Sequence, residues 1–126
     1  MAGEVSGLAP GVYRYRPSSH SLRPVMLGDQ RDELSAHALG QPPISRAPAV
    51  VVITALYVRT TPRYGDRGVR YVHMEVGHAS QNIHLQAAAL GLGTVVIGAF
   101  NDTGVQQALG LQEEEHPLYL MPIGRL

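Results

Sequence analysis

The stretch "GHASQNIHLQAAALGLGTVVIGAFND", residues 77–102, predicts a long helix that ends at glycines and leads into a short buried strand. The apolar residues of this helix recur at intervals of three and four, as they do on one face of an α-helix. The apolar stripe begins before the stretch and comprises Val69, Val72, Val76, Ala79, Ile83, Ala87 and Leu90. We therefore expect a helix from Val69 to Leu90 that is stopped by Gly91 or Gly93.

The strand that follows, "TVVIG", ends in Gly98, and Ala99 comes next. Small residues at the end of a strand let another group approach the backbone closely. Gly91-Leu92-Gly93 also has the first two glycines of a dinucleotide-binding fingerprint. That fingerprint follows a strand, precedes a helix and needs a third glycine three positions on. Here the order is helix, glycines, strand, so a helix stop is favoured.

Further strands and helices are expected on both sides of this stretch. Alternation over Gly11–Pro17 predicts a half-buried strand with Tyr13 and Tyr15 on one face. The β-branched run Ala49–Val58 predicts a central strand covered on both faces. The other expected segments are a strand over 22–27, a helix over 28–40 with Leu34, Ala38 and Leu39 on one face, an irregular proline-rich linker over 41–48, a mobile polar loop over 59–68, a helix over 101–110 capped by Asn101 or Asp102, and a last strand over 116–126. Together they predict one α+β domain over residues 1–126.

The composition excludes several classes of chemistry. The ten cationic side chains are all arginine and balance ten acidic ones, so there is no basic face for nucleic acid. Without lysine, neither Schiff-base chemistry nor a P-loop is expected, and without cysteine there is no thiolate nucleophile or cysteine-ligated metal. The N-terminus lacks the features of a signal peptide, and the longest apolar run is too short to span a membrane. We expect a soluble cytoplasmic protein.

Few polar side chains form a convincing catalytic pattern. Glu75 and His78 share a helix face, but a metal site of that type needs a second such pair, so no metal is expected. Ser80 lies in the middle of the helix, where its hydroxyl is expected to bond its own backbone. Arg70 and Tyr71, at the start of the helix, are better candidates. A guanidinium and a phenol there could bind or protonate a ligand, or could be a solvated arginine beside a packed tyrosine.

From Arg70 to Arg125 the sequence resembles the C-terminal half of the nitroreductase-like flavoprotein family, particularly its azoline-dehydrogenase-like branch. The matching stretches are "RYVHMEVGHASQNIHLQAAALGLGTVVIGAFND" and "EEEHPLYLMPIGR". Upstream, "GLAPGVYRYRPSSHSLRPV" resembles the strand pair of that branch, so the resemblance covers nearly the whole chain. It implies a nitroreductase-like fold with a central, mainly antiparallel sheet, flanking helices and one long core helix.

The resemblance also implies a cofactor, FMN, and residues that contact it. By position, the backbone N–H groups of Gly98 and Ala99 would bond the flavin N5 and O4 edge, while Val96 and Ile97 would pack against the ring. Arg125 would hold the phosphate through its guanidinium. The azoline dehydrogenases carry Lys-Tyr near the active site, and this chain has Arg70-Tyr71. An arginine cannot act as a base at neutral pH, so Tyr71 would remain as a proton donor.

The resemblance implies hydride transfer through flavin N5, between NAD(P)H or a substrate and a small organic acceptor. It also implies a homodimer in which both chains build each flavin site. Family members also carry an N-terminal helix with phosphate-binding arginines and serines, and this sequence starts after that point. A second hypothesis is therefore a truncated, non-catalytic module that dimerises or binds a partner without flavin. A third is a different flat ligand at the same strand end.

Overall fold

The computed structural model describes residues 1–125 of the 126-residue chain. Its main sheet has three antiparallel strands in the order β3 (Ala49–Ala55), β5 (His116–Arg125) and β4 (Leu92–Thr94). The prediction of a mixed, mainly antiparallel α+β fold is confirmed. The prediction that residues 49–58 form the central strand was wrong, because the longer β5 takes the centre and pairs with a strand on each side. Beyond Ala55 the chain turns into the short 3₁₀ helix η2 (Tyr57–Arg59).

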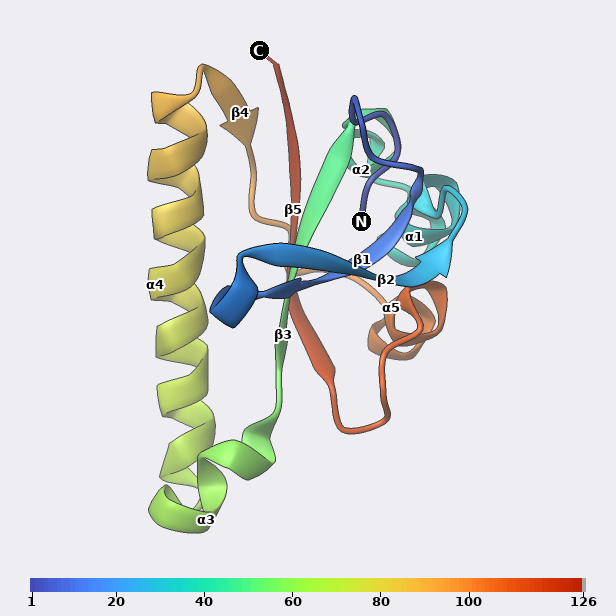
Figure 1. The fold of residues 1–126 in the computed structure, drawn as a ribbon. Helices are drawn as coiled ribbons and strands as arrows, with labels where there is room; N and C mark the ends of the chain where they lie inside the picture. The colour runs from blue at the N-terminus through green and yellow to red at the C-terminus, as the bar shows by residue number, and fades with distance from the viewer. Residues whose placement is uncertain (126) are drawn as a thin grey trace.

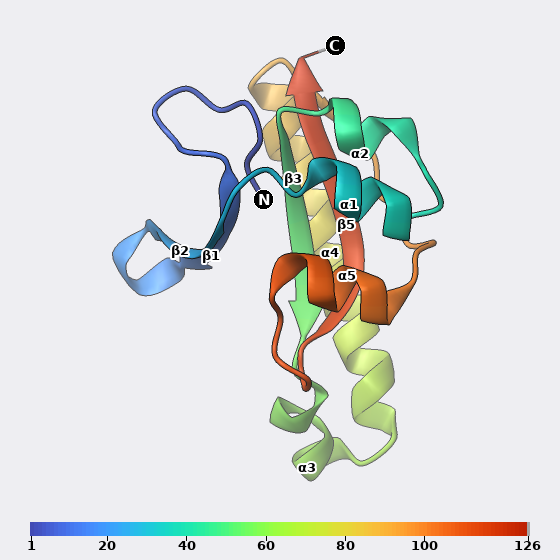
Figure 2. The same ribbon diagram turned by 90° about the vertical axis from the view of Figure 1, so that its right-hand side faces the viewer.

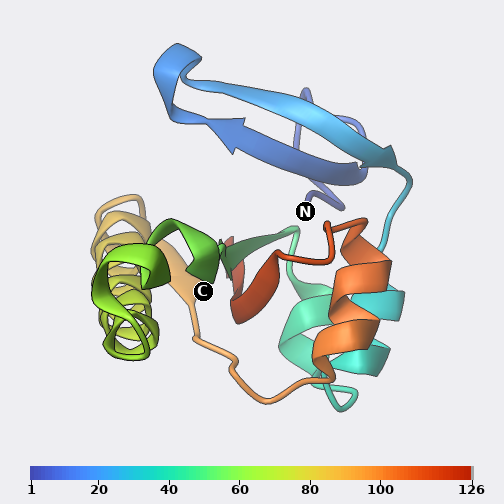
Figure 3. The ribbon, with the colours of Figure 1, turned by 90° about the horizontal axis from the view of Figure 1, so that it is seen from below.

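Helices cover both faces of this sheet (Figure 3). The long α4 (Arg67–Ala89) lies on one face, while α1 (Arg31–His37), α2 (Pro42–Arg46) and α5 (Asp102–Leu109) lie on the other. The main core fills the space between the sheet and these three shorter helices. Its buried residues are Val12, Leu34, Ala38, Ile44, Val50, Ile97, Val105, Leu109 and Leu120.

The predicted long helix is confirmed as α4, which begins two residues earlier than expected. It ends where expected, since Gly91 follows with φ of 68°, a conformation that favours glycine. Val76 and Ala87 are buried against the rest of the chain, but Met74 is 52% exposed and Leu85 is 61% exposed. In one copy of the chain, α4 is therefore half covered by the sheet, and the other half is free for the dimer interface that the sequence offered as the alternative to the core.

The strands β1 (Gly11–Arg16) and β2 (Ser21–Leu27) form a separate two-stranded sheet, joined by the 3₁₀ helix η1 (Pro17–Ser19). Both strands were predicted. This hairpin crosses in front of the main sheet and extends to one side of it (Figures 1 and 2). The prediction that Tyr13 and Tyr15 share a half-buried face is only half right. Tyr13 is partly buried, whereas Tyr15, farther along the hairpin, is exposed.

Several boundaries differ from the prediction for local reasons. The proline-rich linker contains α2, because Pro42 and Pro43 occupy the first turn of a helix, where no backbone N–H is needed. The polar loop over 59–68 contains part of η2 and a short helix, α3 (Thr61–Tyr64). Leu39 lies beyond α1 with φ of 59° and is exposed, so it does not share the buried face. The expected strand over 94–98 is shifted, because β4 covers Leu92–Thr94.

The predicted cap of α5 is confirmed at Asn101, whose Oδ1 accepts a hydrogen bond of 2.7 Å from the backbone N–H of Gly104. We expect Asn101→Ala to lower the free energy of unfolding by about 1 kcal/mol, because this end of the helix loses its side-chain acceptor. Urea denaturation measures this change. Asn101→Asp keeps a side-chain acceptor and serves as the control. An equal loss of stability in both variants would contradict a capping role for Asn101.

Candidate functional site

The segment between β4 and α5 presents unused backbone donors. Ile97 alone stays paired with the sheet, exchanging two 2.9 Å backbone hydrogen bonds with Leu120. Gly98 and Ala99 follow and are exposed, and within residues 1–125 their N–H groups have no hydrogen-bond partner. Two hydrogen bonds join the segment to the region of α1 and α2. Gln41 Nε2 donates to the Ala99 carbonyl at 3.1 Å, and the Asn101 N–H donates to the His37 carbonyl at 2.8 Å. The two free donors are therefore fixed in place.

The four residues expected to contact the flavin ring have different surroundings. Ile97 is only 5% exposed, and its side chain belongs to the core. Val96 is half-buried, and Gly98 and Ala99 are exposed. A Cβ atom added to Gly98 would lie 3.5 Å from the Tyr119 ring, which is ordinary van der Waals contact. The free surface at this segment is thus made by backbone and small side chains, with Tyr119 beside it.

Arg125 lies beside the start of β4, away from Gly98 and Ala99. It ends β5, opposite Leu92 of β4, and its side chain is exposed. It lines an open groove of about 380 Å³ with Arg46, Thr94 and other residues of α2, β4 and β5. The stretch that includes β4 and the residues after it therefore connects the groove at Arg125 with the free donors at Gly98 and Ala99.

Arg70 and Tyr71 do not face the same space. Tyr71 lines a pocket of about 620 Å³ between α4 and residues 54–64, together with Tyr64, Arg59 and Glu75. Its ring packs edge-on against Tyr64, with the ring centroids 5.3 Å apart. Arg70 instead lines a surface pocket of about 340 Å³ with Asp66 and Arg67. Consecutive residues of a helix point in directions about 100° apart, so the pair divides between two pockets.

The structure also brings together residues that the sequence analysis did not select. Tyr64 belonged to the presumed polar loop, yet α3 turns it onto Tyr71. Tyr57 shares a hydrogen bond of 2.8 Å with His73 Nε2 and stacks at a tilt on His116, 5.2 Å away. Burial, and secondarily the charge of Asp102, raise the pKa of Tyr57. These three rings are far apart in the sequence, so no local pattern could have grouped them.

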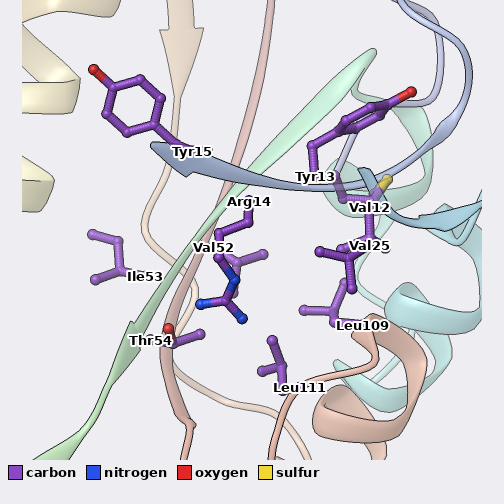
Figure 4. Close-up of a pocket in the computed structure, with 11 residues that line it drawn as sticks. Val12, Tyr13, Arg14, Tyr15, Val25, Val52, Ile53, Thr54, Leu109 and Leu111 are labelled. Atoms are coloured by element: carbon purple, nitrogen blue, oxygen red, sulfur yellow. The ribbon is translucent and has the colours of Figure 1, made fainter. Parts of the chain in front are cut away.

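A fourth cavity lies under the hairpin (Figure 4). It measures about 330 Å³, and its walls come from the hairpin, β3 and α5, including Val12, Val52 and Leu109. Arg14 points into it (Figure 4), but both of its terminal nitrogens donate to the Glu115 carboxylate, at 2.6 and 2.7 Å. Since that charge is already paired, Arg14 does not offer this cavity a free cation.

Three further properties of the described residues bear on function. In residues 1–125, histidine, aspartate and glutamate side chains never gather in groups of three or more that could hold a metal ion. Ser80 Oγ donates to the Gly77 carbonyl at 2.9 Å, as the sequence predicted for a hydroxyl in mid-helix. Across the same residues, none of the helices combines the length and apolar character needed to cross a membrane.

A three-stranded antiparallel sheet between one long helix and a layer of short helices places the chain in the class of mixed α+β proteins. The model of the nitroreductase family matches residues 7–125, and the chain belongs to this family.

The similar proteins are consistent with this membership. A protein of Methanocaldococcus jannaschii named as a nitroreductase is 50% identical over 122 residues, which are 97% of this chain and 61% of that protein. The chain thus spans less than two thirds of this relative. A crystal structure of an Anabaena variabilis protein named as a nitroreductase has a TM-score of 0.90 at 38% identity, over 95% of this chain and 25% of the other. The E. coli microcin synthetase McbBCD complex gives a TM-score of 0.81 at 25% identity, over 90% and 44% of the two chains.

Proposed function

We propose that this chain is an FMN-dependent oxidoreductase of nitroreductase type that acts on a small organic molecule, with NAD(P)H or the substrate as hydride donor. The observation that carries this proposal is the pair of free, fixed backbone donors at Gly98 and Ala99. Membership of the nitroreductase family supports it. When bound, FMN supplies hydride transfer through its N5 atom, and a hydrogen bond from the protein near N5 tunes that reactivity.

The residues of this chain fit a flavin. Backbone N–H groups suit the N5 and O4 edge, because they cannot be titrated and they need close approach, which Gly98 and Ala99 permit. Val96 and the backbone of Ile97 border the proposed ring site, and Arg125 is the proposed phosphate ligand. Tyr71 is the proposed proton donor for substrate in the pocket that it shares with Tyr64. Arg70 lines a different pocket, so no role at this site is proposed for it.

We also propose that the functional unit is a homodimer joined through α4. Its exposed side carries the large apolar side chains of Tyr71, Met74 and Leu85. Large apolar side chains that a helix leaves exposed are suited to packing against another helix. The azoline-dehydrogenase-like branch remains our proposal for the chain's subgroup. The McbBCD complex, which has a truncated pro-MccB17 bound, supports it as a structural neighbour.

The flavin proposal is tested by titrating FMN into the purified protein and into Gly98→Glu. We expect the wild type to quench FMN fluorescence and Gly98→Glu to bind at least about tenfold more weakly, since a long charged side chain would occupy the space beside Tyr119. The fold should persist, because Gly98 is exposed and lies outside the regular strands.

Gly98→Ala is the matched control, because its Cβ fits at ordinary contact distance from Tyr119 and FMN binding should change little. If wild-type protein shows no flavin binding, the non-catalytic module becomes the better description. If Gly98→Glu loses thermal stability and flavin binding in parallel, Gly98 is a packing residue and the assignment of the ring site is wrong.

A further inference from the structure

We propose that the free edge of β3, together with the cavity under the hairpin, binds an extended segment of another polypeptide, which adds to the main sheet as a strand. The cavity is lined by β3 on one side and by the hairpin, which crosses in front of the main sheet, on the other (Figures 1 and 4). This inference does not depend on the proposed flavin site, because β3 and β4 form opposite edges of the sheet.

The backbone of Val52 points away from the rest of the sheet. In an antiparallel pair, successive residues alternate between those that bond to the neighbouring strand and those that point away from it. Val50 points away from β5, since its N–H donates to the Met1 carbonyl at 2.9 Å and its carbonyl accepts from the Met1 amino group at 2.8 Å. Val52 lies two residues farther along β3, so its N–H and C=O point in the same direction.

The residue opposite Val52 agrees with this orientation. Leu120 of β5 lies across from Val52, but its N–H and C=O both bond to Ile97, at 2.9 Å. Within residues 1–125, the N–H and C=O of Val52 therefore have no hydrogen-bond partner. Val52 is also half-buried. An unpaired edge of this kind is a template for the backbone of another chain, which offers a donor and an acceptor at the same spacing.

The first residues of the chain already pair with β3 in this way at one end of the strand. Ala2 bridges Gly11 of β1 and Ala49 of β3. Met1, next to it, bonds to β3 and also lines the cavity, which continues along residues 52–54. A strand bound in the cavity would therefore extend the pairing that these two residues begin.

The side chains around the cavity indicate which segment fits. Its volume is about 330 Å³, and four apolar side chains of the hairpin, α5 and the residues after α5 line it, namely Val12, Val25, Leu109 and Leu111. The charge of Arg14 is paired with Glu115, so the lining favours a neutral segment. Paired residues of two strands share a face of the sheet, and Val52 packs against the core. The residue opposite Val52 should therefore be apolar, and its neighbours can be polar.

Hydrogen exchange of the free protein, measured by NMR, tests the unpaired edge. The Val52 amide should exchange at least about tenfold faster than the Val51 amide, because Val51 points toward Met121 of β5 and has a partner there. Equal protection of the two amides would show that the edge is already covered, within the chain or by a second copy, and the proposal would be wrong.

Binding is tested with a fluorescein-labelled peptide of about six residues, a usual strand length, in which valine and threonine alternate. We expect this peptide to bind and to slow exchange of the Val52 amide. Methylating the backbone nitrogens of its valines should weaken binding at least about tenfold, because those N–H groups face β3, whereas methylating those of its threonines should change binding less. No protection of Val52 at millimolar peptide would overturn the proposal.

A variant of the hairpin tests the position of the peptide. Val25→Glu places a carboxylate in the lining of the cavity and should weaken peptide binding about tenfold. Leu22→Glu is the matched control, because Leu22 lies on the same strand, is 50% exposed where Val25 is 42% exposed, and does not line the cavity. Equal losses in both variants would place the peptide elsewhere. Binding that is the same for both methylated peptides would show that the cavity takes up apolar groups without strand pairing, and strand addition would be wrong.

Discussion

Replacing Glu115 with glutamine is expected to lower the free energy of unfolding by about 2 kcal/mol at neutral pH, the scale of charge-assisted hydrogen bonds. Glu115 is only 3% exposed, and its carboxylate accepts two hydrogen bonds from Arg14 and one from the backbone N–H of Gln112, at 3.2 Å. Arg14 belongs to β1, so this pair ties the hairpin to the turn before β5. Arg14 is about half exposed, so water can solvate its guanidinium in the variant. The loss of stability is therefore smaller than that expected for a fully buried pair.

This contribution should depend on pH. Hydrogen bonding to Arg14, opposed in part by burial, holds the pKa of Glu115 below its ordinary value of 4.5. A carboxylate with a depressed pKa in the folded state stabilises the fold above its unfolded pKa. The stabilisation is lost as the pH falls below about 4.5 toward the folded pKa. The free energies of unfolding of wild type and Glu115→Gln should therefore differ most near neutral pH and become equal in acid.

Urea denaturation at several pH values measures both effects. Glu114→Gln is the control, because Glu114 lies in the same turn but is exposed, and it should change stability by less than about 0.5 kcal/mol. A difference between wild type and Glu115→Gln that is small at neutral pH, or that stays constant down to pH 3, would show that the Arg14–Glu115 pair does not stabilise the fold.

Introducing glutamates at Met74 and Leu85 together is expected to convert a dimer into monomers. The two side chains are eleven residues apart, close to three helical turns, so they lie on the same exposed side of α4. Burying two unpaired carboxylates from each chain in an apolar interface should raise the dissociation constant by at least about 100-fold. Sedimentation velocity at micromolar concentration measures the change.

Leu39→Glu is the matched control, because Leu39 is 73% exposed and follows α1, on the opposite face of the sheet from α4. It should leave the association state unchanged. A monomeric wild type at micromolar concentration would contradict the proposed dimer directly. A Met74→Glu, Leu85→Glu variant that sediments as the wild-type dimer would place the interface elsewhere on the chain.

The sequence by itself determined the features that depend on local periodicity and on single backbone positions. The stripe from Val69 to Leu90 predicted α4, and Gly91 and Asn101 predicted where helices end and begin, because helix spacing, capping and left-handed backbone angles are local requirements. Hydrophobic pattern also predicted β1, β2, β3 and β5. The small residues Gly98 and Ala99 marked the segment that the structure leaves with free donors.

Only the tertiary structure decided how these elements are combined. The apolar run of β3 suggested a central strand, but pairing across the sheet depends on partners distant in the sequence, and β5 takes that place. Tyr71 packs on Tyr64, Arg14 pairs with Glu115, and Arg46 and Arg125 line one groove, because elements distant in the sequence fold together. Their side chains carry no shared local pattern, so the pockets, the half-buried ion pair and the charged groove follow from long-range packing and cannot be derived from spacing along the chain.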